Sequence, residues 1–147
     1  YGGFLKRLQS NFCSGSFSYV GFDLAKTPIE YCKRNYSEKG AQFYATGLPS
    51  KMADFNVMSG TFNYAPDLTV NAWRNYLFSS LSSIWNLTRC SMIFNLMISE
   101  EDKITSQSIS YIRQETILNF CQSNFGATSK YFSSKLPREI TLCISKI

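Results

Sequence analysis

Residues 67–99 read DLTVNAWRNYLFSSLSSIWNLTRCSMIFNLMIS and hold both tryptophans of the chain. Once Asp67 is set aside as a helix cap, Arg74 and Arg89 are the only charged residues in the stretch. About fourteen uncharged residues separate the two arginines, and many of them are Ser or Asn. A membrane-spanning helix needs about 20 predominantly apolar residues. The stretch is therefore predicted to form the core of a folded domain and not a membrane span.

The first part of this stretch has the periodicity of an amphipathic helix. The apolar residues that share one helical face are Leu68, Trp73, Leu77, Leu81, Ile84 and Trp85. Asp67 follows Pro66 and is predicted to cap the helix N-terminus. Residues 90–98 (CSMIFNLMI) fit either a buried strand or a continuation of the helix, and we favour the helix.

The N-terminal half has the alternation of half-buried strands. Residues 16–22 (SFSYVGF) and 42–46 (QFYAT) alternate bulky with polar side chains, as strands do. Residues 54–64 alternate on both sides of Ser59-Gly60, a hairpin signal. These patterns predict a small antiparallel β-meander.

The C-terminal part predicts a second helix and a closing strand. Ser99 followed by three acidic residues resembles a helix cap, and the helix is expected to stop near Gly126. After Pro137 the alternation predicts a strand. The predicted fold class is α+β: the antiparallel β-meander packs against two amphipathic helices, and the C-terminal strand closes the sheet. Residues 1–147 are predicted to form a single domain, with residues 1–10 as a flexible N-terminal segment.

The composition excludes several kinds of chemistry. The chain has 147 residues, of which 44% are hydrophobic, so disorder is not expected. It has no histidine, which removes Ser-His and Cys-His nucleophile pairs and most zinc sites. The glycines occur singly except Gly2-Gly3, so no phosphate-binding loop is predicted. The net charge of +5 is scattered, which argues against nucleic-acid binding.

No catalytic, cofactor-binding or metal-binding residue is assigned from the sequence. Consecutive carboxylates such as Glu100, Glu101 and Asp102 point in different directions on a helix and cannot converge on one substrate atom. Cys90 or Cys121 could act as a nucleophile only with a lowered thiol pKa, and no histidine is present to share a proton. The sequence therefore predicts a protein that is not an enzyme and needs no cofactor.

The cysteines lie far apart, at Cys13, Cys32, Cys90, Cys121 and Cys143, with no CxxC spacing. Wide dispersion is typical of disulfides in a secreted domain, with one cysteine left over. The alternative is a cytosolic chain with five buried thiols. The chain starts at Tyr1 without an apolar leader, which we interpret as removal of a signal peptide. The triplets at Asn35 and Asn86 make these two residues candidates for N-glycosylation.

Residues 1–7, Tyr-Gly-Gly-Phe-Leu-Lys-Arg, resemble the opioid-peptide message followed by a dibasic cleavage pair. The resemblance covers only these seven residues and implies nothing about the fold. It implies that Tyr1 and Phe4 would carry binding. Because the message occurs once and the rest of the chain is too hydrophobic for a spacer, we interpret it as a coincidence or a tolerated terminal segment.

The aromatic content of 16% exceeds what a core of this size needs. Trp73, Tyr76 and Trp85 are therefore candidates for a binding surface or pocket. The sequence predicts a secreted, extracellular glycoprotein that acts through a protein partner or self-assembly. The alternative is a carrier that holds a small apolar ligand between the helices and the sheet.

Overall fold

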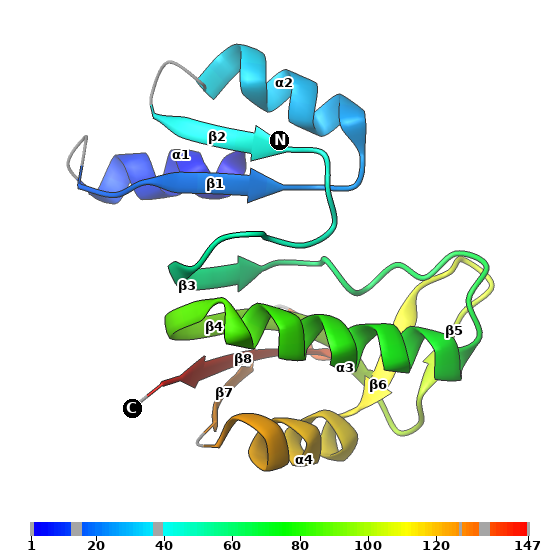
Figure 1. The fold of residues 1–147 in the computed structure, drawn as a ribbon. Coiled ribbons are helices and arrows are strands. Elements are labelled where there is room, and N and C mark those ends of the chain that lie inside the picture. The colour runs from blue at the N-terminus through cyan, green and yellow to red at the C-terminus, as the bar shows by residue number, and fades with distance from the viewer. Residues whose placement is uncertain (1, 13–15, 37–39, 127, 133–135, 147) are drawn as a thin grey trace. The chain divides into compact units, whose positions relative to one another are not determined.

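The computed structural model describes residues 2–12, 16–36, 40–126, 128–132 and 136–146 (Figure 1). The side chains of residues 128–132 are outside that description. The chain divides into two compact units, Tyr1–Pro49 and Ser50–Ile147, and each is described by itself. That the 147 residues behave as a single domain stays a prediction.

Unit 1 is a parallel two-stranded sheet with two helices (Figure 1). Its elements are α1 (Gly3–Asn11), β1 (Tyr19–Phe22), α2 (Lys26–Tyr36) and β2 (Ala41–Tyr44). Helix α2 joins β1 to β2, as parallel strands require a crossover connection. In the register of the pair, Tyr19 lies opposite Ala41 and Phe22 lies opposite Tyr44.

The core of unit 1 is small. Helix α2 buries Ile29, Cys32 and Tyr36, which recur at helical spacing on one face. The other buried members of the cluster are Leu5 of α1 and Ala41 and Phe43 of β2. Pro28 lies in the first turn of α2, where its missing N–H leaves no helical hydrogen bond unmade.

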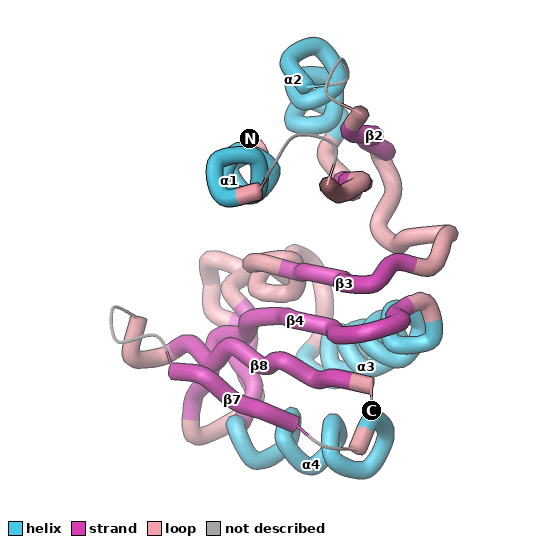
Figure 2. The backbone as a smooth tube through the Cα atoms, turned by 90° about the vertical axis from the view of Figure 1, so that its left-hand side faces the viewer, coloured by secondary structure: helices cyan, strands magenta, loops and turns pink. Residues whose placement is uncertain are grey.

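Unit 2 contains a mixed sheet centred on one long strand (Figure 2). Its elements are β3 (Ala53–Met58), α3 (Val70–Asn86), β4 (Thr88–Ser99), β5 (Lys103–Ile104), β6 (Ser110–Arg113), α4 (Gln114–Phe125), β7 (Thr128–Phe132) and β8 (Glu139–Ser145). The strand order is β5-β6-β4-β8-β7, and β3 also pairs with β4. Strand β4 runs parallel to β3 and β6 and antiparallel to β8.

The favoured helical continuation over residues 90–98 is wrong, because these residues form most of β4. Met92, Phe94 and Leu96 are at most 1% exposed, and the residues between them are half-buried. Because the half-buried face also carries Ile93 and Met97, the apolar sequence is nearly continuous and resembles that of a buried helix. The C-terminal cap of α3 is Leu87, so only one residue separates the helix from the strand.

Helix α3 confirms the predicted helix in the middle of the chain, with a different cap. Thr69 is the N-cap, and its Oγ1 accepts a hydrogen bond from the Ala72 N–H at 3.2 Å. Helices α3 and α4 lie side by side on one face of the sheet (Figures 1 and 2). Phe78 and Phe120 stack between them, with ring centroids 4.0 Å apart. In the described part of the chain, no helix is long and apolar enough to cross a membrane.

The predicted α+β class with an antiparallel meander is wrong. The pairs β1–β2 and β3–β4 are parallel, and residues 3–11 and 26–36 are helical. Ser59-Gly60 begins the loop to α3 instead of a hairpin turn. Period-two alternation reports which side chains share a strand face, but it does not report the direction of the partner strand. The predicted strand after Pro137 is present as β8, and the predicted helix end near Gly126 is the end of α4.

Candidate functional site

The carboxyl end of β1 carries an exposed acidic residue, Asp23. Its Oδ1 accepts a hydrogen bond from the Ala25 N–H at 2.8 Å, which fixes the carboxylate where the chain turns into α2. Among the described residues, no other hydrogen bond to this carboxylate occurs. The next residue, Leu24, is 74% exposed. A carboxylate beside an exposed apolar side chain can bind a ligand that has both hydroxyl donors and an apolar ring.

The N-terminus of α1 is a second polar feature of unit 1. Helix α1 runs antiparallel to β1, so its N-terminus faces the edge of the sheet where β1 ends (Figure 1). It has no side-chain cap and no acidic residue in its first turn. The N–H of Lys6 makes the first helical bond, to the Gly2 carbonyl at 3.0 Å. The preceding N–H groups have no helical acceptor, and they carry the positive end of the helix dipole.

Two adjacent glycines shape this helix start. Gly2 has φ +75° and a Cβ added there would lie 2.5 Å from the Tyr36 ring, so a larger residue would have to displace that ring. A Cβ at Gly3 would meet no atom within 4 Å, so the backbone there is open to a ligand. Asp23 lies twenty positions after Gly3. That spacing of a glycine turn, a helix start and an acidic strand end occurs in nucleotide-binding α/β folds.

Burial and neighbouring charge shift three pKa values in unit 1. The hydrogen bond to Tyr36 raises the pKa of Lys6, whose Nζ lies 5.9 Å from the centre of the Tyr36 ring. Burial raises the pKa of Tyr19. Burial also raises the pKa of Cys32, and the charge of Asp23 adds to that shift. Cys32 and Tyr19 are therefore uncharged near neutral pH.

Unit 2 has a groove at the carboxyl end of β4. The groove has a volume of about 860 Å³ and is lined by Ile98, Ser99, Glu100, Glu101, Lys103, Gln114, Pro137 and Arg138. Its walls include two carboxylates and two cations, so it is not an apolar pocket. In open α/β sheets, ligands bind outside the carboxyl ends of parallel strands, and β4 ends here.

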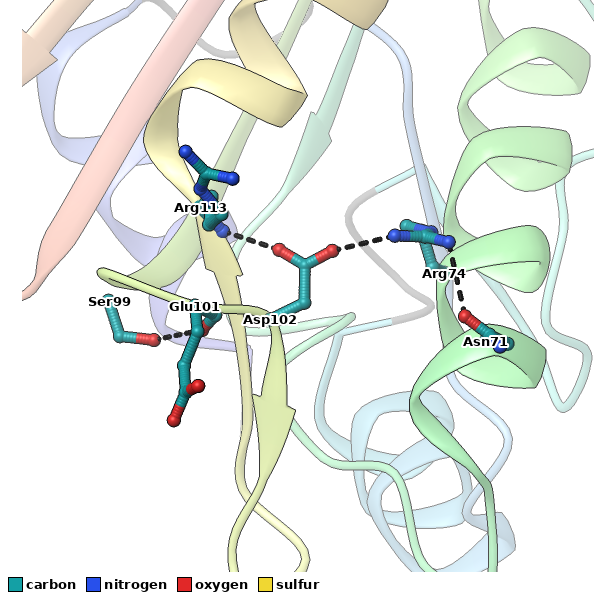
Figure 3. Close-up of polar contacts among 6 residues, drawn as sticks. All are labelled: Asn71, Arg74, Ser99, Glu101, Asp102 and Arg113. Carbon is teal, nitrogen blue, oxygen red and sulfur yellow. Dashed lines mark hydrogen bonds and ion pairs between the residues drawn. The ribbon is translucent and has the colours of Figure 1, made fainter.

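Asp102 holds the turn that forms one wall of this groove (Figure 3). Its Oδ2 accepts from Arg74 Nη1 of α3 at 3.0 Å, and its Oδ1 accepts from the Arg113 N–H of β6 at 2.7 Å. The Asp102 side chain is 11% exposed and the Arg74 side chain is 37% exposed. The predicted helix cap over residues 99–102 is wrong, because Asp102 anchors a turn to α3 and β6 while α4 begins at Gln114.

The predicted disulfides are wrong for the cysteines that the structure describes. Cys32 and Cys121 are buried, Cys143 is half-buried, Cys90 is exposed, and all four are free thiols. Cys13 lies outside the described residues. Burial raises the pKa of Cys121 to about 12, so this thiol is a poor nucleophile. The predicted extracellular location stays a prediction, now without the disulfides from which it was inferred.

The three aromatic candidates occupy different environments. Trp73 is 2% exposed and donates its indole N–H to the Phe62 carbonyl at 3.0 Å, so it belongs to the core. Tyr76 is 43% exposed. Trp85 is half-buried, with Lys146 Nζ 4.8 Å from its ring centre. A binding role for these residues stays a prediction.

The glycosylation candidates and the opioid-like segment are also placed. Asn35 is exposed on α2, and Asn86 is exposed at the last residue of α3; glycosylation at either residue stays a prediction. Phe4 lies in α1 and is 48% exposed, while Tyr1 lies outside the described residues. In the described ranges, no group of three or more Cys, Asp or Glu residues could hold a metal ion.

Sequence patterns alone do not identify Asp23 or the α1 N-terminus. A pair of glycines before a helix and an acidic residue at a strand end form a signal only if residues 3–11 are recognised as helical. Helix α1 lacks a capping side chain and includes no acidic residue in its first turn, so the usual start signals are missing.

Comparison with known proteins shows the fold. No family model and no curated protein matches the chain. Among solved structures it is similar to magnesium protoporphyrin IX methyltransferase of Synechocystis PCC 6803 with bound SAM, with 10% identity, a TM-score of 0.60, and coverage of 87% of this chain and 59% of that one. It also matches a chain of the Pnkp1/Rnl/Hen1 RNA repair complex, with 13% identity, a TM-score of 0.66, and coverage of 98% and 35%.

A third match is a SAM-dependent methyltransferase of Leishmania major, with 10% identity, a TM-score of 0.61, and coverage of 97% of this chain and 70% of that one. The chain therefore has a Rossmann-like fold of the kind found in SAM-dependent methyltransferases. It spans 59% and 35% of the lengths of the first two structures.

These matches overturn the predicted function. The methyltransferases among the matched structures are enzymes, and two are described with bound SAM or its product SAH. The prediction of a disulfide-stabilised, non-enzymatic binding module is therefore wrong in its class, and the predicted protein partner loses its support. The alternative of a carrier for an apolar ligand is overturned by the same comparison, because the matched structures include methyltransferases.

Proposed function

We propose that this chain forms part of a SAM-dependent methyltransferase and that unit 1 holds the adenosine and amino-acid ends of SAM. The observation that carries the proposal is Asp23, an exposed carboxylate at the carboxyl end of a parallel strand. It is fixed by the Ala25 N–H and lies at the edge that the α1 N-terminus also faces.

The described residues fit the chemistry of SAM. A ribose diol offers two hydroxyl donors, and a carboxylate is the side chain that accepts both. Leu24 is exposed beside Asp23 and offers apolar contact for the adenine ring. The uncapped N–H groups of α1 offer donors for the carboxylate of the methionine part, favoured by the helix dipole.

When bound, SAM supplies an electrophilic methyl group on its sulfonium for transfer to a nucleophilic atom of an acceptor. The role proposed for unit 1 is binding and orientation, which contribute to the rate by holding reactants in productive geometry. The groove at the end of β4 belongs to unit 2, and its shape depends on the turn that Asp102 anchors to α3 and β6.

The same fold supports other chemistry, so binding has to be measured first. One matched structure is described as a pericyclic reaction enzyme, with 8% identity and a TM-score of 0.64. An acidic residue at a strand end also binds the ribose of nicotinamide dinucleotides. The comparison with methyltransferases favours SAM over a dinucleotide.

The test is calorimetric titration of the full 147-residue chain with SAH, SAM and NAD. We expect SAH and SAM to bind and NAD to bind at least tenfold more weakly. Asp23→Asn should weaken SAH binding by about 10- to 100-fold, since a hydrogen bond to a charged group contributes about 1.5–3 kcal/mol. Asp67→Asn is the matched control: Asp67 is also exposed and has a positive φ of 58°, which Asn tolerates.

Circular dichroism must first show that each variant keeps the secondary structure of the parent. If the folded chain binds neither SAH nor SAM, the proposal fails. It also fails if Asp23→Asn and Asp67→Asn bind SAH equally well, because Asp23 would then not contact the ribose. Tighter binding of NAD would replace the methyltransferase assignment with a dinucleotide-binding one.

A further inference from the structure

Lys6 is a cation in the first turn of a helix. It is the fourth residue of α1, which begins at Gly3, and its N–H makes the first helical hydrogen bond, to the Gly2 carbonyl. The positive end of a helix dipole disfavours a cation and favours an anion. Helix α1 has no acidic residue in its first turn and no capping side chain. Two sources of positive potential, the helix dipole and the ammonium, therefore lie together.

Tyr36 of α2 holds the Lys6 ammonium beside the start of α1. Lys6 Nζ lies 5.9 Å from the centre of the Tyr36 ring, and a hydrogen bond joins the two side chains. The same ring lies against Gly2, because a Cβ added at Gly2 would be 2.5 Å from it. Side chains in a helix lean toward its N-terminus, which is the direction of this contact. One buried ring therefore contacts both Lys6 and the residue that precedes α1.

No carboxylate among the described residues neutralises Lys6. The ion pairs in these ranges are made by Arg74, Arg89 and Arg113, all in unit 2. The neighbours that raise the pKa of Lys6 are Tyr36 and then Tyr31, and no Asp or Glu contributes. Local rules of protein structure are broken most often at functional sites. A cation in the first turn of a helix, without a carboxylate partner, therefore indicates that a ligand supplies the negative charge.

Helix α2 relates Lys6 to Asp23, the residue proposed to bind the ribose. Burial raises the pKa of Cys32 and the charge of Asp23 adds to that shift, so the carboxylate lies within electrostatic range of this thiol. Cys32 and Tyr36 are one helical turn apart on the buried face of α2. Asp23 and Lys6 therefore lie near successive turns of one helix. This arrangement suits a ligand that has a diol at one end and an anionic group at the other.

We infer that the Lys6 ammonium binds the carboxylate of the amino-acid part of SAM and makes unit 1 selective for ligands that keep this carboxylate. The inference rests on the proposed function, because it assigns one end of the same ligand. The bound carboxylate would form a charge-assisted hydrogen bond with Lys6 and would lie at the favoured end of the helix dipole. Tyr36 is a positioning residue, because it acts on the ligand only through Lys6.

The test compares two ligands that differ only in this carboxylate, SAH and its decarboxylated analogue S-adenosyl-3-thiopropylamine. Each is titrated by calorimetry into the full 147-residue chain and into its Lys6→Gln variant. Glutamine matches lysine in helix propensity, so the substitution removes the charge and keeps α1. We expect Lys6→Gln to weaken SAH binding about fivefold to tenfold and to leave binding of the analogue within about twofold of the parent. Added salt should weaken SAH binding more in the parent than in Lys6→Gln, because salt screens the ion pair.

Arg7→Gln is the matched control, since Arg7 is the next residue of α1, is also exposed, and loses the same charge. It should leave SAH binding within about twofold of the parent. Lys6→Arg keeps the charge and should retain more of the SAH affinity than Lys6→Gln does. Tyr36→Phe keeps the buried ring and removes the hydroxyl, and it tests the contact if Lys6→Gln fails to fold. It should weaken SAH binding about twofold to threefold and leave the analogue unchanged, which a merely structural role would not do.

Equal weakening of both ligands by Lys6→Gln would overturn the inference, because the carboxylate would then not be the group that Lys6 binds. Equal effects of Lys6→Gln and Arg7→Gln on SAH binding would overturn it in favour of a general effect of charge. Asp23→Asn should weaken both ligands, since both keep the ribose. If Asp23→Asn does so and Lys6→Gln weakens neither, this inference fails and the proposed function stands. If the parent chain binds neither ligand, both fail.

Discussion

The two compact units differ in the size of their buried cores and in the candidate ligand groups that they carry. Unit 1 has a cluster of six buried residues and carries the candidate ligand groups, Asp23 and the α1 N-terminus. Unit 2 buries Trp73, Leu81 and, on the central strand β4, Met92, Phe94 and Leu96, each at most 2% exposed. Exposed polar groups that bind a ligand contribute little to a core. We therefore expect the unit that binds to be the less stable of the two, in line with the general pattern that binding elements open more readily.

The largest expected effect is the loss of Trp73 from unit 2. Trp73→Ala removes a buried side chain and the hydrogen bond to the Phe62 carbonyl. A substitution of this kind lowers the free energy of unfolding by about 3–5 kcal/mol. Urea unfolding followed by the fluorescence of Trp85 measures the change. Tyr76→Ala, on the exposed side of the same helix, should cost less than about 1 kcal/mol.

Equal effects of Trp73→Ala and Tyr76→Ala would contradict this prediction. The result would mean that α3 does not supply the centre of the unit 2 core, and the contrast between the units would then lose its main support.

The second expected effect is confined to unit 1, and it tests whether the two units unfold separately. Leu5 is 1% exposed in the core of unit 1. Leu5→Ala should leave a cavity in this core and lower the free energy of unfolding of unit 1 by about 2–5 kcal/mol. A core of six buried residues stabilises unit 1 only weakly. Amide hydrogens in β1 and β2 of the variant should therefore exchange much faster than in the parent, as measured by mass spectrometry. Amides in β4 and β8 should be unaffected.

Faster exchange in all four strands of the Leu5→Ala variant would show that the chain unfolds as one cooperative body. The control is Leu24→Ala in the same unit. Leu24 is 74% exposed, so its removal should leave exchange in β1 and β2 unchanged.

The comparison also explains what the sequence could predict. Helix α3 and strand β8 were predictable because each has a clear apolar period with polar residues on its other face. Strand β4 was not, since its half-buried face also carries the apolar residues Ile93 and Met97, which obscure the alternation that distinguishes a strand from a helix. Helix α2 is absent from the predicted meander, and Pro28 lies in its first turn, where proline is favoured.

The candidate site was harder to predict than the fold for a physical reason. The direction of β1 relative to β2 decides whether Asp23 lies at a carboxyl edge, and strand direction depends on the crossover through α2. No local pattern reports it. The groove in unit 2 combines residues from β4, β5, the start of α4 and the segment just before β8, which come together only in the folded sheet. Cysteine spacing was misleading because dispersed cysteines are equally compatible with buried thiols.

The smallest effect compares one thiol from each unit. Cys32 in unit 1 and Cys121 in unit 2 are both buried, whereas Cys90 is exposed. Timed alkylation with iodoacetamide at pH 8, read by peptide mass spectrometry, should modify Cys90 first, Cys32 next and Cys121 last. The order of the two buried thiols follows from the smaller core around Cys32, which opens more often. Modification of Cys121 before Cys32 would reverse the proposed ranking of the two units.

The pKa of Cys121 gives the same comparison a pH dependence. Burial raises this pKa from 9.0 to about 12 in the folded chain. Because the folded pKa lies above the unfolded one, the neutral thiol stabilises the fold fully below pH 9, and that contribution is lost as the pH rises toward 12. The urea midpoint should therefore fall between pH 8 and pH 10 more for the parent than for Cys121→Ala, which has no thiol to ionise on unfolding. An equal decrease of the urea midpoint in the two proteins would mean that Cys121 is more solvated than its 0% exposure implies. Unit 2 would then open near α4 as readily as unit 1 does.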